Sequence, residues 1–245
     1  MQNTKNIEFV ITGCGRSGTT YVSELLQKAG IKCGHESVFE VTGPAKSESQ
    51  YRADSSWFCA PFLIDLPQNV KVLHVVRNPA KVVSSFHRIG LCADTMWIQF
   101  SKGKTPLEFM AKENYRLAKF KKHFRRYAYV KNHRKLLEKY TTCFKEKLEV
   151  GRLWQYWYQW NEMIEGQLSK MPNESLVVRL EDIDSRLDEV TTFFGIQGYV
   201  EPVKPANLKK GYRKRTISWV EPGEEVFRLA DYYGYSEEEV RSQMK

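Results

Sequence analysis

Residues 7–27 read IEFVITGCGRSGTTYVSELLQ and combine an apolar run, a glycine-rich loop and a helical pattern. The run 7–13 predicts a buried strand, because β-branched and aromatic residues follow one another without polar alternation up to a glycine. The stretch 19–30 predicts a helix that ends at Gly30, with apolar residues at helical spacing: Tyr21, Leu25, Leu26 and Ala29. The order is therefore strand, glycine-rich loop, helix.

Two further segments repeat this alternation of strand and helix. Residues 70–77, VKVLHVVR, predict a strand, and Pro79 suits the first turn of a following helix. Residues 175–183, SLVVRLEDI, predict a third strand before a helical stretch that ends in FFGI. Such alternation favours a parallel sheet with ligand sites outside the carboxyl ends of the strands. We therefore predict an α/β fold with three layers, α/β/α, around a central parallel sheet.

Length and composition indicate one folded domain over residues 1–245, with 42% hydrophobic residues. No apolar run approaches the ~20 residues that span a bilayer, and the first residues begin no secretory signal. The cysteines are odd in number and form no CxxC pair, which disfavours a disulfide framework or a zinc site and indicates a cytoplasmic protein: Cys14, Cys33, Cys59, Cys92 and Cys143.

The net charge of +9 comes from one segment. Residues 112–147 contain thirteen basic and three acidic side chains, so the rest of the chain is close to neutral. We predict a basic helical insertion at about 102–149 that contacts an anionic acceptor, although a solvated helical face is the usual role of such a run. Aromatic residues interleave with the cations and leave an RNA-binding or polyanion-binding alternative, which ranks low because their spacing is helical.

The loop GCGRSGTT, residues 13–20, has the glycine spacing of the phosphate-binding motif GxxxxGK[ST], as in the P-loop nucleotide kinases. Its backbone N–H groups and the following helix N-terminus predict an anion site. Thr19 replaces the lysine, Thr20 keeps the hydroxyl, and Arg16 supplies a cation earlier in the loop. No apolar strand ends in an aspartate that would bind magnesium, since residues 70–77 end in Arg77. The loop alone leaves a kinase as an alternative.

The strand, the loop 13–20 and the following helix resemble the same region of the sulfotransferases that use 3′-phosphoadenosine-5′-phosphosulfate (PAPS). The loop is similar to their 5′-phosphosulfate loop, in the arginine form of carbohydrate and tyrosylprotein sulfotransferases. Arg77 and Ser85, eight residues apart, resemble the 3′-phosphate motif, and their side chains suit a shared phosphate. The basic stretch 209–215 resembles a loop over the 3′-phosphate and adenine. The resemblance thus implies a set of cofactor-binding residues: Gly15, Arg16, Ser17, Gly18, Thr19, Thr20, Arg77, Ser85, Lys210, Arg213 and Arg215.

The resemblance extends toward the carboxyl terminus. Residues 154–164, WQYWYQWNEMI, look like the family's aromatic helix, which ends in an asparagine-containing turn. Residues 175–196 look like its late strand and helix. We expect these stretches to define the fold and their aromatic residues to lie in the core.

The stretch IKCGHESVF, residues 31–39, contains the candidate catalytic base. Glu36 resembles in position the glutamate that acts as the catalytic base in tyrosylprotein sulfotransferases. His35 is the alternative, because cytosolic sulfotransferases use a histidine as their base. The resemblance implies that Arg16 stabilises charge on the transferring group. Residues 47–62 are a candidate acceptor surface, through Arg52, Ser56 or Trp57.

We therefore expect a PAPS-dependent sulfotransferase that acts by in-line displacement and uses no metal. The acceptor is a hydroxyl of a glycan, peptide, lipid or small molecule, and the residues do not indicate which. The alternatives are a P-loop small-molecule kinase and a non-catalytic module that binds polyanions or RNA. A preference for ATP with Mg²⁺ over 3′-phosphoadenosine-5′-phosphate would indicate the kinase. Binding of RNA or heparin without nucleotide binding would indicate the non-catalytic module.

Overall fold

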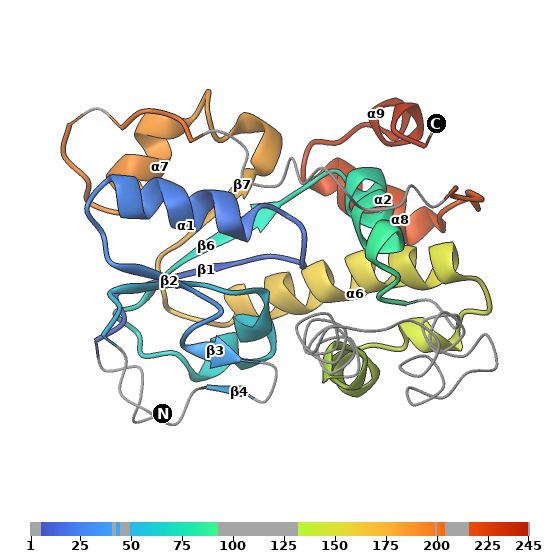
Figure 1. Cartoon of the computed structure of the whole chain (residues 1–245), viewed down its shortest axis with the longest axis horizontal. Coiled ribbons are helices and arrows are strands. Elements are labelled where there is room, and N and C mark those ends of the chain that lie inside the picture. Colours follow the sequence, from blue (N-terminus) through green and yellow to red (C-terminus); the bar gives the residue numbers. More distant parts are fainter. Residues whose placement is uncertain are drawn as a thin grey trace, which may run out of the picture.

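The computed structural model describes residues 6–40, 43–44, 50–92, 132–198, 200–203 and 216–244. Within these ranges five strands form one parallel sheet in the order β2-β5-β1-β6-β7 (Figure 1). The strands are β1 (Phe9–Thr12), β2 (Cys33–His35), β5 (Ala53–Ser55), β6 (Lys71–Val76) and β7 (Ser175–Arg179). A small antiparallel pair lies beside the sheet, formed by β3 (Phe39–Glu40) and β4 (Gly43–Pro44).

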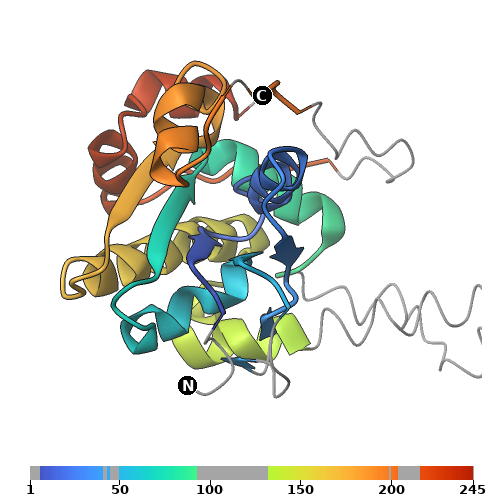
Figure 2. The same ribbon diagram turned by 90° about the vertical axis from the view of Figure 1, so that its left-hand side faces the viewer.

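Helices cover both faces of the sheet, which Figures 1 and 2 show from two directions. One face packs against α1 (Thr19–Lys28) and α7 (Leu187–Phe193). The other packs against η2 (Trp57–Asp65), α2 (Pro79–Ile89), α6 (Glu149–Leu168) and α8 (Glu224–Tyr232). Shorter elements are η3 (Cys143–Lys145), η4 (Leu180–Asp182) and α9 (Glu237–Ser242). The predicted three-layer α/β/α fold around a parallel sheet is confirmed.

Strand side chains alternate between the two hydrophobic clusters, as the pleat requires. Ile11 and Val75 belong to the cluster beneath α1 and α7, whereas Val10 and Val76 belong to the cluster beneath α6. This double burial explains why β1 and β6 read as continuous apolar runs in the sequence. The three predicted strands are all present, although the third ends at Arg179 and continues as the 3-10 turn η4.

A buried histidine links the sheet to α6. The Nδ1 atom of His74 on β6 lies 2.9 Å from Oε1 of Glu165, and Nε2 lies 3.1 Å from Oδ1 of Asn161. Burial opposes ionisation of Glu165, but hydrogen bonds from His74 and Tyr233 hold the pKa of Glu165 below its ordinary value. The helix α6 runs on to Leu168, so Asn161 lies inside it, and the expectation that the aromatic helix ends in an asparagine-containing turn is wrong.

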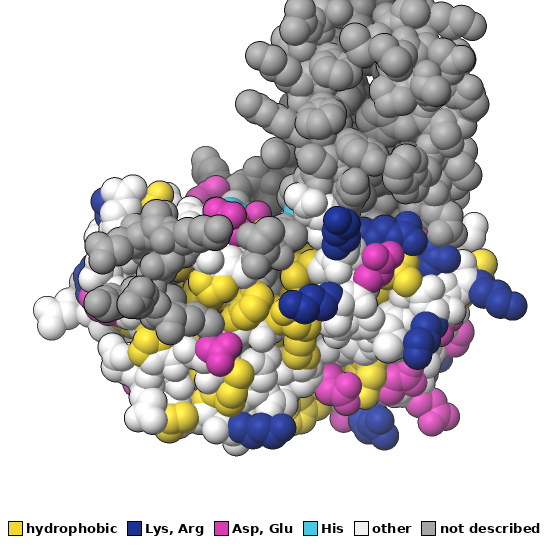
Figure 3. Space-filling model, turned by 90° about the horizontal axis from the view of Figure 1, so that it is seen from below, with side chains coloured by type: hydrophobic (Ala, Val, Ile, Leu, Met, Phe, Trp, Pro, Cys, Tyr) yellow, Lys and Arg dark blue, Asp and Glu magenta, His cyan; other side chains and the backbone are white. Residues whose placement is uncertain are grey.

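The basic segment enters the described structure only at its end. Residues 132–140 are helical, and Leu136 and Leu137 are buried in the core, so this helix packs on the domain. Residues 102–131 of the predicted insertion lie outside the described residues. On the face drawn in Figure 3, the described basic side chains are interspersed with acidic ones, and apolar side chains gather near its centre. None of the described helices is long and apolar enough to cross a membrane.

Candidate functional site

The glycine-rich loop, residues 13–18, joins β1 to α1 at the carboxyl edge of the sheet. Gly18 precedes α1 with φ 107°, a left-handed conformation that favours glycine. A Cβ atom there would lie 2.4 Å from Cδ1 of Leu180, so a larger residue would also displace this side chain. No side-chain hydrogen bond caps α1, which leaves the N–H groups of its first turn for an anion.

Several groups of the loop are directed to the protein itself. The Gly15 N–H donates to the Tyr156 hydroxyl at 2.6 Å, and both groups are buried. The Ser17 hydroxyl donates to the Cys14 carbonyl at 2.6 Å. Burial raises the pKa of the Cys14 thiol to about 12, so this cysteine stays neutral. Gly15 and Ser17 therefore shape the loop, and the exposed donors of the site come from its other residues.

The two motifs that the resemblance assigned to opposite ends of one nucleotide meet in space. The Arg16 Nε atom donates to the Ser85 hydroxyl at 2.8 Å, and the Arg77 Nη1 atom donates to the Arg16 carbonyl at 3.0 Å. Arg77 is half-buried, and its Nε has no hydrogen-bond partner among the described residues. Such an orphan donor is costly unless a ligand satisfies it. Arg16, Arg77 and Ser85 thus form a cationic site at the carboxyl edge of β1 and β6.

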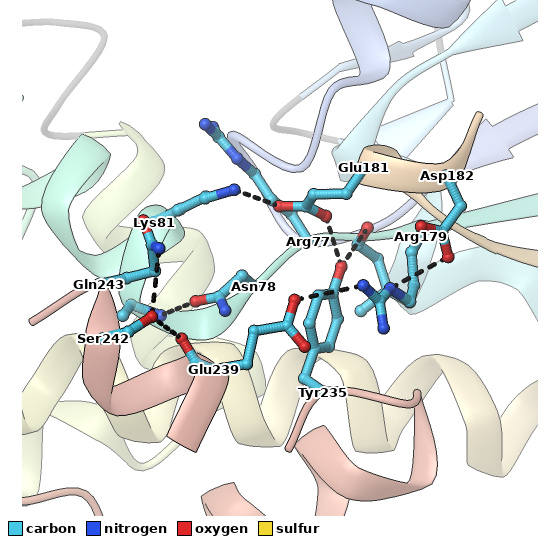
Figure 4. A network of polar contacts seen from close by, with 12 residues as sticks. Arg77, Asn78, Lys81, Arg179, Glu181, Asp182, Tyr235, Glu239, Ser242 and Gln243 are labelled. Atoms are coloured by element: carbon cyan, nitrogen blue, oxygen red, sulfur yellow. Dashed lines mark hydrogen bonds and ion pairs between the residues drawn. The ribbon is translucent and has the colours of Figure 1, made fainter. Parts of the chain in front are cut away.

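The charge balance around Arg77 depends on one carboxylate. Burial lowers the pKa of Arg77, nearby Glu181 opposes this effect, and the charge of Arg16 adds to it. Figure 4 shows Arg77 beside Glu181, which accepts hydrogen bonds from Lys81 Nζ at 3.1 Å and the Tyr235 hydroxyl at 2.6 Å. Both oxygens of Glu181 are therefore used by Lys81 and Tyr235. Glu181 is thus shared between Lys81, Tyr235 and the charge of Arg77.

His35 ends β2 and Glu36 begins the turn that follows it, next to the loop. The His35 Nδ1 atom donates to the Ser55 carbonyl at 2.9 Å, and Nε2 lies 2.7 Å from the Thr20 hydroxyl. In the neutral imidazole, Nε2 therefore accepts from Thr20, and its lone pair is engaged. This arrangement favours Glu36 over His35 as a base.

Glu36 is half-buried and its carboxyl is tuned by several neighbours. Burial raises the pKa of Glu36, His35 opposes this effect, and Asp54 reinforces it, while Trp57 and Arg16 lower the pKa. A carboxylate with a raised pKa is a stronger base than one in water. The charge of Arg16 acts on Glu36, and the neighbouring His35 contacts Thr20 at the start of α1, so Glu36 lies near the loop.

Backbone geometry selects the same two residues. Among the described non-glycine residues, only Arg16 and Glu36 have positive φ, at 73° and 54°. Left-handed backbone costs on the order of 1 kcal/mol for such residues and persists where the surrounding structure enforces it, often at functional sites. The two residues predicted to carry catalysis are therefore held in uncommon conformations.

The other predicted residues divide between the site and the rest of the fold. Arg52 pairs with Glu8 at 2.6 Å and precedes β5, so it lies at the amino edge of the sheet, away from the loop. Ser56 is buried and donates to the Phe39 carbonyl. Trp57 is at the site, because a Cβ atom on Gly15 would lie 3.2 Å from its ring. Lys210, Arg213 and Arg215 lie outside the described residues.

Four further residues were missed by the sequence analysis. Tyr156 reaches the loop from α6, and Asp54 lies beside Glu36. His133, from the end of the basic segment, stacks on Trp57 with ring centroids 5.3 Å apart. Tyr235 binds Glu181 near Arg77. In the sequence alone, an aromatic residue looks like a core residue and an acidic residue looks like a surface residue. No motif therefore marked these four residues.

Comparisons with known proteins agree on the architecture. No family model and no curated protein matches the chain. Eleven chains of solved structures are similar, among them the sulfotransferase domain from the curacin biosynthetic pathway, with a TM-score of 0.55 and 12% identity over 94% of this chain and 98% of that chain. The chain has the fold of a sulfotransferase domain. A sulfotransferase from Alicyclobacillus acidocaldarius has a TM-score of 0.43 and 11% identity over 97% of this chain and 95% of that chain, too distant to support an argument.

Proposed function

We propose that this protein is a sulfotransferase that transfers the sulfuryl group of PAPS to an acceptor hydroxyl. The convergence of Arg16, Arg77 and Ser85 on the glycine-rich loop carries this proposal. The shared fold agrees with it but is too distant in sequence to supply an activity. The closer likeness to carbohydrate and tyrosylprotein sulfotransferases and a cytoplasmic location are parts of the same proposal.

The described residues fit the two anionic ends of PAPS. The orphan Nε of Arg77 and the hydroxyl of Ser85 suit its 3′-phosphate, since a guanidinium fork and a hydroxyl both donate to phosphate oxygens. The uncapped first turn of α1, with Thr19 and Thr20, suits the 5′-phosphosulfate. PAPS, when bound, supplies an activated sulfuryl group and a phosphate leaving group.

Arg16 and Glu36 then have separate roles. Arg16 belongs to the loop and contacts Ser85, so it would offer a permanent charge to oxygens on which negative charge builds. Glu36 accepts the proton of the acceptor hydroxyl, so its carboxyl must be ionised. Its raised pKa makes the ionised carboxylate a stronger base. General base catalysis of this kind contributes about 10²–10⁴ in rate. Positioning of the acceptor in line with the sulfuryl group adds to this.

Trp57 and His133 stack on one another, but both side chains are buried, so neither offers a surface to an acceptor. The basic segment, residues 112–147, suits an acceptor that carries negative charge. We therefore propose an anionic, hydroxyl-bearing acceptor. Nucleic acid ranks low, because the aromatic residues that interleave with the cations of the basic segment lie near helical spacing.

The test compares nucleotides by calorimetry and thermal shift: 3′-phosphoadenosine-5′-phosphate (PAP), ATP with Mg²⁺, and heparin. PAP at about 100 times its Kd is expected to stabilise the protein by about 2.7 kcal/mol. Preference for ATP with Mg²⁺ would support the kinase alternative, and heparin binding without PAP binding would support the polyanion module.

The role of Glu36 is tested separately with the Glu36→Gln variant. This variant is expected to bind PAP like the wild type and to lose about 10²–10⁴ in sulfuryl transfer from ³⁵S-labelled PAPS across an acceptor panel. Glu40→Gln is the control, because Glu40 is exposed on the neighbouring strand β3. Equal turnover in the two variants would exclude Glu36 as the base.

A further inference from the structure

Asp54 is a fully buried carboxylate on β5, the strand next to the edge strand β2. It lies in β5, between Val10 of β1 and Gly34 of β2 in the strand register. Its Oδ1 atom accepts the N–H of Ser37 at 3.1 Å, and its Oδ2 atom accepts the N–H of Phe39 at 3.1 Å. A buried carboxylate is expensive unless hydrogen bonds compensate its lost hydration. Here both oxygens are used by one neighbouring turn.

The turn that Asp54 binds is residues 36–39, which contains the proposed base. Glu36 adopts φ 54° at its start, and its N–H donates to the Ser55 carbonyl at 3.2 Å. Two bonds to Asp54 and one to Ser55 thus tie the turn to β5. A strained residue persists only when neighbours enforce its conformation. Gly34 makes room for this arrangement, because a Cβ atom there would lie 2.7 Å from Oδ1 of Asp54.

Asp54 also contributes charge to the surroundings of Glu36. The groups that act on Glu36 are His35 from the end of β2, Asp54 from β5, Arg16 from the loop and Trp57 from η2. His35 and Arg16 favour the ionised carboxylate, and Asp54 disfavours it. Burial also raises the pKa of Asp54 itself, so the two carboxyls titrate as interacting groups.

We propose that Asp54 is a positioning residue for sulfuryl transfer, which fixes the 36–39 turn and holds the Glu36 carboxyl toward the loop. This inference rests on the proposed function of Glu36. Asp54 touches neither nucleotide nor acceptor and acts through the backbone of Ser37 and Phe39.

The experiment uses Asp54→Asn, with Asp65→Asn on the exposed end of η2 as the control. The amide retains the shape of the carboxylate but loses its charge and one of the two acceptors. PAP affinity is expected to stay unchanged, and kcat is expected to fall by about tenfold to a hundredfold through misplacement of the base. The titration of the Glu36 carboxyl, followed by ¹³C NMR, is expected to move to lower pH, because a neighbouring negative charge has been removed.

The pH profile separates positioning from simple structural damage. A base must be ionised, so turnover rises with pH through the pKa of Glu36, and in Asp54→Asn this limb is expected to move to lower pH with the NMR titration. An unmoved limb and an unmoved titration would overturn the proposal. Since the NMR titration needs no substrate, it also reports on Asp54 if the sulfotransferase assignment itself fails.

A second measurement does not depend on the folding of a variant. In the wild-type protein, the amides of Ser37 and Phe39 are expected to be protected from hydrogen exchange, because Asp54 accepts both. The amide of the exposed Lys32 is a reference in the segment before β2. Exchange of Ser37 and Phe39 as fast as Lys32 would overturn the positioning role.

Discussion

Replacement of Tyr156 by phenylalanine tests how α6 supports the glycine-rich loop. The change removes one oxygen, which accepts the buried Gly15 N–H at 2.6 Å. The ring keeps its edge-on contacts with Phe86 and Trp57, at centroid distances of 5.1 and 6.1 Å. The substitution therefore isolates the hydrogen bond from the packing.

The magnitude follows from the state of the donor that remains. A buried N–H left without a partner costs about 1–3 kcal/mol. Water cannot easily reach Gly15, because a Cβ atom there would already lie 2.7 Å from the ring of Phe86. With ~2 kcal/mol lost, a domain of 245 residues is expected to melt about 4–8 °C lower.

Denaturant unfolding and calorimetry measure this loss, and Tyr158→Phe is the matched control. Tyr158 is two residues along the same helix, and its hydroxyl bonds to Glu162 on the exposed side. An exposed bond of this kind is replaced by water, so less than about 0.5 kcal/mol is expected. Equal effects of the two substitutions would refute the view that Tyr156 supports the loop.

Three further predictions concern the nucleotide site and the core. Arg77→Ala is expected to weaken PAP binding by roughly 10- to 150-fold, because a hydrogen bond to a charged group contributes about 1.5–3 kcal/mol. Arg52→Ala, at the opposite edge of the sheet, is the control and is expected to leave the Kd for PAP unchanged when both variants are measured by calorimetry. Glu165→Gln is expected to destabilise the fold at pH 7. Since the folded pKa of Glu165 is depressed, the difference from wild type should shrink as pH falls below about 4, and a constant difference in unfolding free energy would contradict this. Gly18→Ala is expected to lower the melting temperature more than Gly30→Ala, because both residues have positive φ but only Gly18 adds a clash; similar shifts would argue against the packing constraint.

Local patterns were sufficient to predict the fold class and the three strands that lead to the glycine-rich loop, to Arg77 and to η4. β1 and β6 are buried on both faces, so their apolar runs were visible without knowledge of their neighbours. β2 and β5 escaped prediction, because each has three residues and β5 contains the polar Asp54 and Ser55. A strand so short is recognisable only by the strands it pairs with.

Site residues show the same division. Arg16, Arg77 and Ser85 belong to motifs with fixed spacing, and their contact in space agrees with the resemblance that selected them. Tyr156 and Asp54 have no motif of their own, since Tyr156 is one aromatic among several on α6. Their significance comes from what they touch, which is the Gly15 N–H in one case and the 36–39 turn in the other.

The order of strand, loop and helix was inherent in residues 7–27, because backbone conformation and glycine spacing are local properties, and the anion site of this loop stays a prediction. The proposed roles of Glu36 and Asp54 and the charge balance of Arg77 beside Glu181 depend on burial and on charges brought together from distant segments. Desolvation and charge interaction act through space, so these properties arise only when the sheet has assembled and the carboxyl ends of its strands meet.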